Sequence, residues 1–161
     1  MLKFCKILAL SLLIFTSACS DEKKSEPEKA VNEALIVVPD TNEVRHTYNI
    51  DIADTQEKLY HGLMGRTSMD ENYGLLFDIS IAPKDQEIAF WMKDTLIALD
   101  FVFVDEAGKV FYLYKNAQPN DLSTIRAPQR PRAVLEINAG QIDKYGIQVG
   151  DELKADLLGN K

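Results

Sequence analysis

Six charged, polar or aromatic side chains are the strongest candidates for chemistry, because each stands in or beside an apolar stretch of the chain. They are Arg66, Trp91, Lys93, Thr95, Asp100 and Glu136. If the turn at residues 93–95 lies near Arg66, the two cations and the Thr95 hydroxyl can hold a carboxylate or a phosphate. The alternative is two buried ion pairs, in which Arg66 and Lys93 face Asp100 and Glu136, since charges near a core are normally paired.

Enzymatic roles have less support in the sequence. Asp100 and Glu136 can serve as the acid and base of a hydrolase or lyase, but sequence does not measure their separation. Only His46 and His61 are available as imidazole bases, and the chain has no GxSxG, GxxxxGK[ST] or GxGxxG motif. We therefore expect a binding protein with no catalytic residue, and keep the acid pair as the alternative.

Soft metal ligands are present but scattered. They are His46, His61, Met64, Met69 and Met92. Thioethers and imidazoles suit copper, yet the spacing gives no tight cluster, and methionine often fills gaps in a core. A lone histidine on the apolar face of a strand, as His46 is here, is usually a packed residue. We expect no metal site and no cofactor, and periplasmic copper binding is the less favoured alternative.

The N-terminus resembles a bacterial lipoprotein signal. A short basic region precedes the apolar residues 7–15, which are too few to span a bilayer, and small residues at 16–18 lead to Cys19. In that class of signal, cleavage before the cysteine leaves a thiol that carries lipid. Ser20 follows the cysteine, where an aspartate would suggest retention at the inner membrane. We expect a lipid-anchored protein on the periplasmic face of the cell envelope, with the outer membrane favoured.

Composition divides the chain into three parts. Residues 1–18 are the expected signal peptide, residues 19–33 a flexible tether of charged and small residues, and residues 34–161 one folded domain. Cys5 and Cys19 are the only cysteines, so the domain has no disulfide and no thiol nucleophile. The formal charge of −7 disfavours nucleic acid as a partner.

Alternating and apolar runs predict a mainly β, α+β domain. We expect a small barrel or rolled antiparallel sheet of about eight short strands, with a main helix at 55–64 and a short helix at 139–145. The expected strands lie at 35–38, 44–52, 74–77, 87–93, 99–105, 110–115, 133–138 and 152–157. Residues 118–132 contain three prolines and are expected to form a loop whose Arg126, Arg130 and Arg132 pair with acidic neighbours or bind a ligand.

Five ordered motifs carry a resemblance to a known family. They are Gly62-Leu63-Met64-x-Arg66, Gly74-x-Leu76-Phe77, Trp91-Met92-Lys93-x-Thr95, Leu99-Asp100-x-x-Phe103 and Leu135-Glu136-x-Asn138-Ala139-Gly140. Together they resemble the DUF192 family, a domain of unknown function, over roughly residues 50–157. The resemblance implies a compact, mainly β domain and no particular activity. We expect an envelope protein that binds an anionic small molecule, an envelope polymer or a protein partner.

Overall fold

The structure is a computed structural model, and it describes residues 32–160. The expected signal peptide, Cys19 and most of the tether lie outside the described residues. Within 32–160, no helix combines the length and the apolar character needed to cross a membrane.

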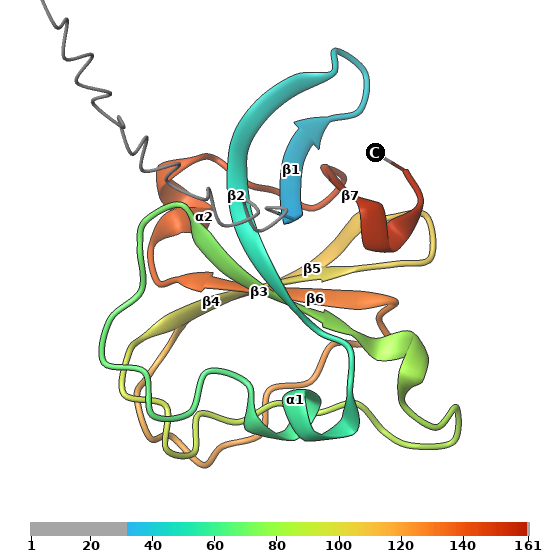
Figure 1. Cartoon of the computed structure of the whole chain (residues 1–161). Coiled ribbons are helices and arrows are strands. Elements are labelled where there is room, and N and C mark those ends of the chain that lie inside the picture. The colour runs from blue at the N-terminus through green and yellow to red at the C-terminus, as the bar shows by residue number, and fades with distance from the viewer. Residues whose placement is uncertain (1–31, 161) are drawn as a thin grey trace, which may run out of the picture.

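A single sheet of seven strands forms the domain (Figure 1), so the mainly β prediction is confirmed. The strands are β1 (Asn32–Val38), β2 (Glu43–Ala53), β3 (Tyr73–Asp78), β4 (Leu99–Val104), β5 (Val110–Ala117), β6 (Ala133–Asn138) and β7 (Glu152–Ala155). Their order is β5-β4-β6-β3-β2-β1-β7. All neighbours are antiparallel except β2 and β3, whose long connection carries helix α1 (Gln56–His61) and so allows a parallel pairing.

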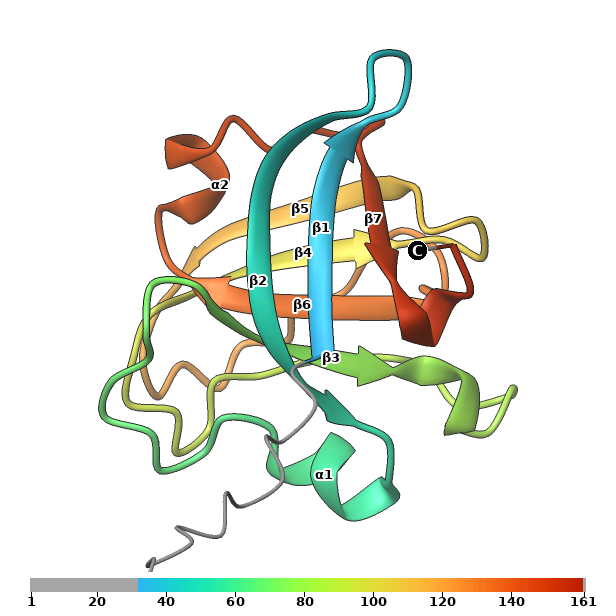
Figure 2. The same cartoon turned by 45° about the horizontal axis from the view of Figure 1, so that its top comes forward.

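The sheet is rolled but not closed, so of the two expected forms, a small barrel or a rolled sheet, the structure has the rolled sheet. Figure 2 shows β1, β2 and β7 crossing over β4, β5 and β6. The edge strands β5 and β7 approach each other only through an isolated bridge between Lys109 and Glu152, and they share no ladder. The chain turns at residues 148–151, directly before β7, so no ladder forms between them.

Two cores lie on opposite faces of the central strands. The inner core fills the space inside the roll, where Val102 and Val104 of β4 meet Leu135 and Ile137 of β6. The outer core lies on the other face and includes Phe101 and Phe103 of β4, with β-strand alternation separating the two sets. The outer core is covered by α1 and by two irregular segments, residues 82–98 and 118–132.

The strand expected at residues 87–93 is wrong. That segment makes a single bridge, in which the backbone amides of Phe90 and Ile125 each donate to the other's carbonyl at 3.0 and 2.8 Å. The partner segment is residues 118–132, whose prolines restrict its backbone, and its backbone hydrogen bonds to residues 87–93 are confined to this bridge and to the Met92 amide, which donates to the Asp121 carbonyl at 2.9 Å. The other seven expected strands are present; β6 has the expected bounds, and the other six have shifted ends.

Both expected helices are present but shorter than predicted. The Thr55 hydroxyl accepts a hydrogen bond from the Lys58 amide at 3.2 Å and caps α1. The helix ends before Gly62, whose φ of 50° favours glycine, and not at Gly65. The second helix, α2, spans Gln141–Lys144, and short 3-10 turns occupy Ile79–Ile81 and Asp156–Leu158.

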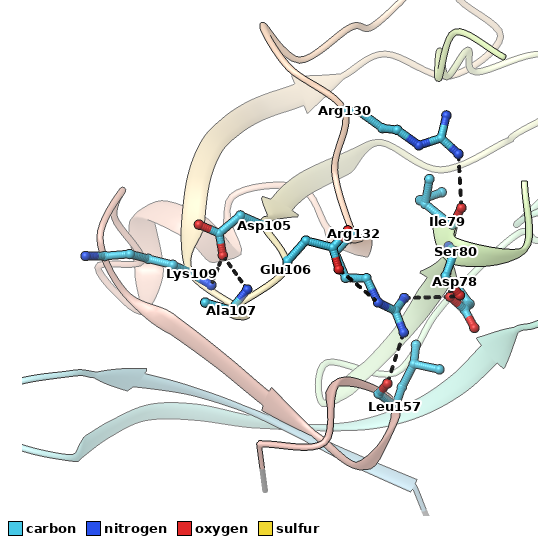
Figure 3. A network of polar contacts seen from close by, with 10 residues as sticks. All are labelled: Asp78, Ile79, Ser80, Asp105, Glu106, Ala107, Lys109, Arg130, Arg132 and Leu157. Carbon is cyan, nitrogen blue, oxygen red and sulfur yellow. Dashed lines mark hydrogen bonds and ion pairs between the residues drawn. The ribbon is translucent and has the colours of Figure 1, made fainter. Parts of the chain in front are cut away.

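Arg132 fastens the loop of residues 118–132 to the sheet through Asp78 of β3 (Figure 3). The Arg132 guanidinium lies 2.6 Å from the Asp78 carboxylate and donates to the Leu157 carbonyl at 3.2 Å. The Arg126 guanidinium lies 2.8 Å from the Glu87 carboxylate. The expected pairing with acidic neighbours is therefore confirmed for both arginines.

Arg130 has a different role. Its guanidinium donates to the carbonyl oxygens of Gln86 at 2.7 Å, Ala82 at 3.0 Å and Ile79 at 3.3 Å. It therefore holds the backbone of residues 79–86 in place, next to the cavity described below.

Candidate functional site

A cavity of about 290 Å³ opens between the outer face of the sheet, α1 and residues 82–98. We call it the Glu136 cavity. Its walls combine aromatic and aliphatic side chains with a few polar groups. The residues that define it are His61, Leu63, Met64, Phe77, Phe90, Trp91, Met92, Thr95, Leu99 and Glu136.

Glu136 is the buried acid of this cavity. It lies on β6, with Leu75 of β3 and Phe101 of β4 opposite it in the two neighbouring strands, and it is 5% exposed. No hydrogen bond or ion pair reaches its carboxyl group from any residue in the described range 32–160. Burial alone raises its pKa to about 8. The side chain is therefore mainly protonated at neutral pH.

Thr95 and Trp91 come from the irregular wall of the cavity. Residues 92–95 form a tight turn, closed by a 3.1 Å hydrogen bond from the Thr95 amide to the Met92 carbonyl, with Asp94 at a φ of 54°. Thr95 is 5% exposed, and its hydroxyl has only a long, 3.4 Å contact with the Lys93 carbonyl. Trp91 is 44% exposed and lies at the rim.

Arg66 and Lys93 do not line the Glu136 cavity. The Arg66 guanidinium donates to the Tyr73 hydroxyl at 2.9 Å, stacks 4.5 Å above the same ring and lies 4.0 Å from the Asp51 carboxylate. This cluster lies in a second cavity of about 570 Å³. The Lys93 ammonium lies 5.5 Å from the Trp91 ring centroid. The structure therefore does not join the two cations into one anion site, nor does it pair them with the two buried acids.

Asp100 lies on the inner face, away from the cavity. It is fully buried, and its carboxylate accepts hydrogen bonds from the backbone amides of Asn116 at 2.8 Å and Ile142 at 3.0 Å. Because Phe101, the next residue, is the partner of Glu136 in the sheet, the two acids project from opposite faces. They cannot act together on one substrate in this arrangement.

The soft ligands divide between the two cores. His46 is on the inner side, where its ring stacks on Tyr145 at 3.7 Å and burial lowers its pKa. His61, Met64 and Met92 all line the Glu136 cavity, whereas Met69 packs against the outer core. In residues 32–160, no group of three or more His, Cys, Asp or Glu side chains has the geometry to hold a metal ion.

The apolar walls are the part of the site that the sequence did not reveal. Phe77 and Phe90 look like ordinary core residues in an alternating or apolar run, and their position on a cavity depends on tertiary packing. Gly62 gave one usable signal, because a glycine inside a predicted helix suggests close approach by another element. A Cβ at this position would lie 3.3 Å from the Phe77 ring, so this prediction is confirmed.

Comparison with known proteins places this geometry in a family. Residues 37–155 match DUF192, described as an uncharacterized ACR, COG1430, and the chain belongs to this family. No curated protein matches the chain.

Two crystal structures are similar. One, from Sinorhizobium meliloti 1021, is described as a "putative transcription regulator"; it is 26% identical with a TM-score of 0.72, over 82% of this chain and 98% of that one. The other, a protein of unknown function from Novosphingobium aromaticivorans DSM 12444, is 29% identical with a TM-score of 0.69, over 80% of this chain and 89% of that one.

Proposed function

We propose that this member of the DUF192 family is a lipid-anchored envelope protein whose domain binds a small molecule in the Glu136 cavity. One observation carries the proposal: Glu136 is only 5% exposed, lines a cavity, and receives no hydrogen bond or ion pair on its carboxyl group from the described residues 32–160. Burying such a group without a hydrogen bond is unfavourable, and native proteins nearly always satisfy buried polar atoms. A bound ligand would supply the missing partner.

The shape of the site supports a small ligand over a polymer or a protein. A volume of about 290 Å³ lies at the lower end of the range for ligand pockets, and the walls present apolar and polar surface in similar amounts, so a small ligand can bury an apolar body and still meet directed polar groups. Thr95 offers a hydroxyl, and Trp91 offers a ring that a ligand can stack on at the rim. A polymer or partner protein would need a longer or flatter surface than this cavity provides.

Binding can be followed through Trp91, which is the only tryptophan in the chain. We expect small aromatic compounds such as benzylamine, benzyl alcohol and benzoate to include at least one that changes the Trp91 emission saturably. Glu136→Gln should weaken that response, whereas Glu106→Gln, a matched change at an exposed position outside the cavity, should leave it unchanged. If none of the three compounds changes the Trp91 emission, the proposed function is wrong.

The membrane anchor is supported by the N-terminal pattern that ends at Cys19. In a bacterial host, labelled palmitate should be incorporated into the wild-type chain and not into Cys19→Ser. The wild-type chain should also sediment with membranes, and density fractionation should place it mainly with the outer membrane. Equal labelling of both chains would contradict the anchor.

A soft metal ion is a second candidate occupant, because His61, Met64 and Met92 line the same cavity. Thioether and imidazole ligands favour Cu(I) over harder ions. Silver(I), a redox-stable substitute, should then raise the melting temperature of the wild type and not of Met92→Leu. If silver stabilises both proteins equally, this candidate fails.

A further inference from the structure

We propose that the small molecule is an organic ammonium ion, with its charged end bound to Glu136 and its apolar body lying against Phe77, Phe90 and Trp91. The proposal rests on the function proposed above and adds the chemical class of the ligand. It reverses the anionic ligand expected from Arg66 and Lys93, because neither of those cations lines this cavity.

The charge of the cavity favours a cation. Its ionisable side chains are Tyr60, His61, Glu87 and Glu136, and neither lysine nor arginine lines it. Glu87 is already paired with Arg126 at 2.8 Å, on the exposed side of the wall. A positive group entering from solvent therefore finds one unpaired acid and no competing cation.

Of the residues that the structure describes, no lysine or arginine is packed around the Glu136 carboxyl group. β3 and β4 place Leu75 and Phe101 beside it, and both are apolar. On the opposite wall, the ionisable groups are Tyr60 and His61 from α1 and Glu87 from residues 86–95. An ammonium group is the complement that an acid in these surroundings lacks, since an N–H donor of opposite charge makes the strongest hydrogen bond to a carboxylate.

The walls suit the rest of such a molecule. The Phe90 ring packs edge to face against Phe77 at 5.2 Å and Phe101 at 5.6 Å between centroids, and Trp91 lies exposed at the rim. Aromatic faces attract organic cations through their negative quadrupole and bury apolar surface at the same time. An amine with a compact apolar body satisfies both parts of the cavity.

Proton balance gives the proposal a distinctive signature. The free carboxyl group is protonated at neutral pH, since its pKa lies near 8. When an ammonium ion binds, the carboxyl O–H releases its proton to solvent and the resulting carboxylate accepts an N–H hydrogen bond from the ligand. Each binding event at pH 6–7 therefore releases about one proton, so affinity rises about tenfold per pH unit and levels off above pH 8.

The test compares three ligands that share one ring: benzylammonium, benzyl alcohol and benzoate. Titrations of the purified protein at pH 6, 7 and 8, followed by Trp91 emission and by calorimetry in two buffers of different ionisation enthalpy, measure affinity and proton release. We expect benzylammonium to bind at least ten times more tightly than benzoate at pH 8, with the pH dependence given above. Glu136→Gln should remove both the preference and the proton release, and Glu106→Gln should change neither.

Several results would overturn the ammonium assignment. They are tighter binding of benzoate or benzyl alcohol, a pH-independent affinity for benzylammonium, or an unchanged preference in Glu136→Gln. If Glu136→Gln does not fold, the number of protons that the wild type releases on binding benzylammonium tests the ammonium assignment by itself, and release of no proton contradicts it. Failure of all three ligands to bind removes the proposed function itself, which distinguishes the two failures.

Discussion

At the scale of single residues, two buried carboxyl groups on adjacent strands meet different surroundings. Asp100 accepts two backbone N–H bonds, which stabilise its negative charge and leave little capacity for a ligand. Glu136 has no such donors and faces a cavity. The Asp100 carboxylate therefore stabilises the fold, whereas the Glu136 carboxyl group is available to a ligand.

The first prediction concerns pH and Glu136. Its pKa rises on folding, so between about pH 5 and pH 8 the folded state holds a proton that the unfolded state has released. The free energy of unfolding should therefore fall as pH rises through this window, by about 1 kcal/mol per pH unit from this group. Urea denaturation of wild type and Glu136→Gln at pH 5, 6, 7 and 8 measures it.

The comparison isolates Glu136 from other titrating groups, such as His46. The variant should lose the falling slope and become relatively more stable at pH 8 than at pH 5. If the difference between the two proteins does not vary with pH, the carboxyl group is not protonated in the folded state as described.

A second prediction concerns Asp100. In Asp100→Asn, the amide group can turn only one oxygen toward the two N–H donors, so one buried backbone amide loses its acceptor. We expect a loss of about 2 kcal/mol in the free energy of unfolding at pH 7. Chemical denaturation measures the loss, and binding of benzylammonium should be retained because Asp100 faces the inner core. A variant as stable as the wild type would contradict this role.

Part of the candidate site could be predicted from the sequence. Trp91, Thr95 and Glu136 are among the charged, polar or aromatic residues that packing alone does not explain, and all three line one cavity. Arg66 and Lys93 are candidates for the same reason but lie elsewhere. Alternation assigns faces within one strand, but it does not give the register between strands. For this reason the opposite faces of Asp100 and Glu136 could not be read from the sequence.

At the scale of elements, two segments without regular structure build the outer wall of the site. Residues 82–98 are joined to residues 118–132 by the Phe90–Ile125 bridge and by the Met92 amide, which donates to the Asp121 carbonyl at 2.9 Å. Local alternation at residues 87–93 resembled a strand, but strand formation also needs a partner with free N–H groups. The alternation describes residues 87–93 alone and says nothing of the segment that would have to pair with them.

A third prediction tests how this wall is held. Arg130→Met removes three hydrogen bonds to the carbonyl oxygens of residues 79–86, so we expect the unfolding free energy to fall by about 1 to 2 kcal/mol and the Trp91 response to ligand to weaken. Arg126→Met is the matched control on the same loop. Its ion pair with Glu87 is exposed on both sides, so the loss should stay within about 0.5 kcal/mol.

Thermal and urea denaturation of the two variants give the comparison. Equal losses would show that Arg130 acts only as a surface charge. A larger loss in Arg126→Met would contradict the assignment of the wall to Arg130.

At the scale of the whole molecule, the domain is a rolled sheet whose two edges approach without pairing. The composition and the short alternating strands predicted the roll, but closure depends on how far the last strand extends beside the fifth. The pairing is antiparallel, so the residues of β5 after Val110 would need partners before Glu152, and there the chain turns at residues 148–151, so no ladder forms. Single backbone contacts hold the edges near each other instead: the Leu153 amide donates to the Gly108 carbonyl at 2.8 Å, and the Val110 amide to the Asp151 carbonyl at 2.7 Å.

The last prediction tests this contact between the edges through Gly108. A Cβ at this position would lie 2.7 Å from the Leu153 carbonyl oxygen and 2.5 Å from the Asn160 side-chain nitrogen, and its φ of 79° is also unfavourable for other residues. Gly108→Ala must therefore push the edges apart. Gly65→Ala is the control, because Gly65 lies away from the edges and has a similar φ of 77° with nothing near its would-be Cβ. We expect the control to lose about 1 kcal/mol from backbone strain and Gly108→Ala to lose at least about 2 kcal/mol more from the clash.

Urea denaturation measures both losses, and amide exchange should show faster opening of β7 in Gly108→Ala alone. If the two variants lose the same stability, the approach of the edges contributes nothing beyond the conformation of the turn.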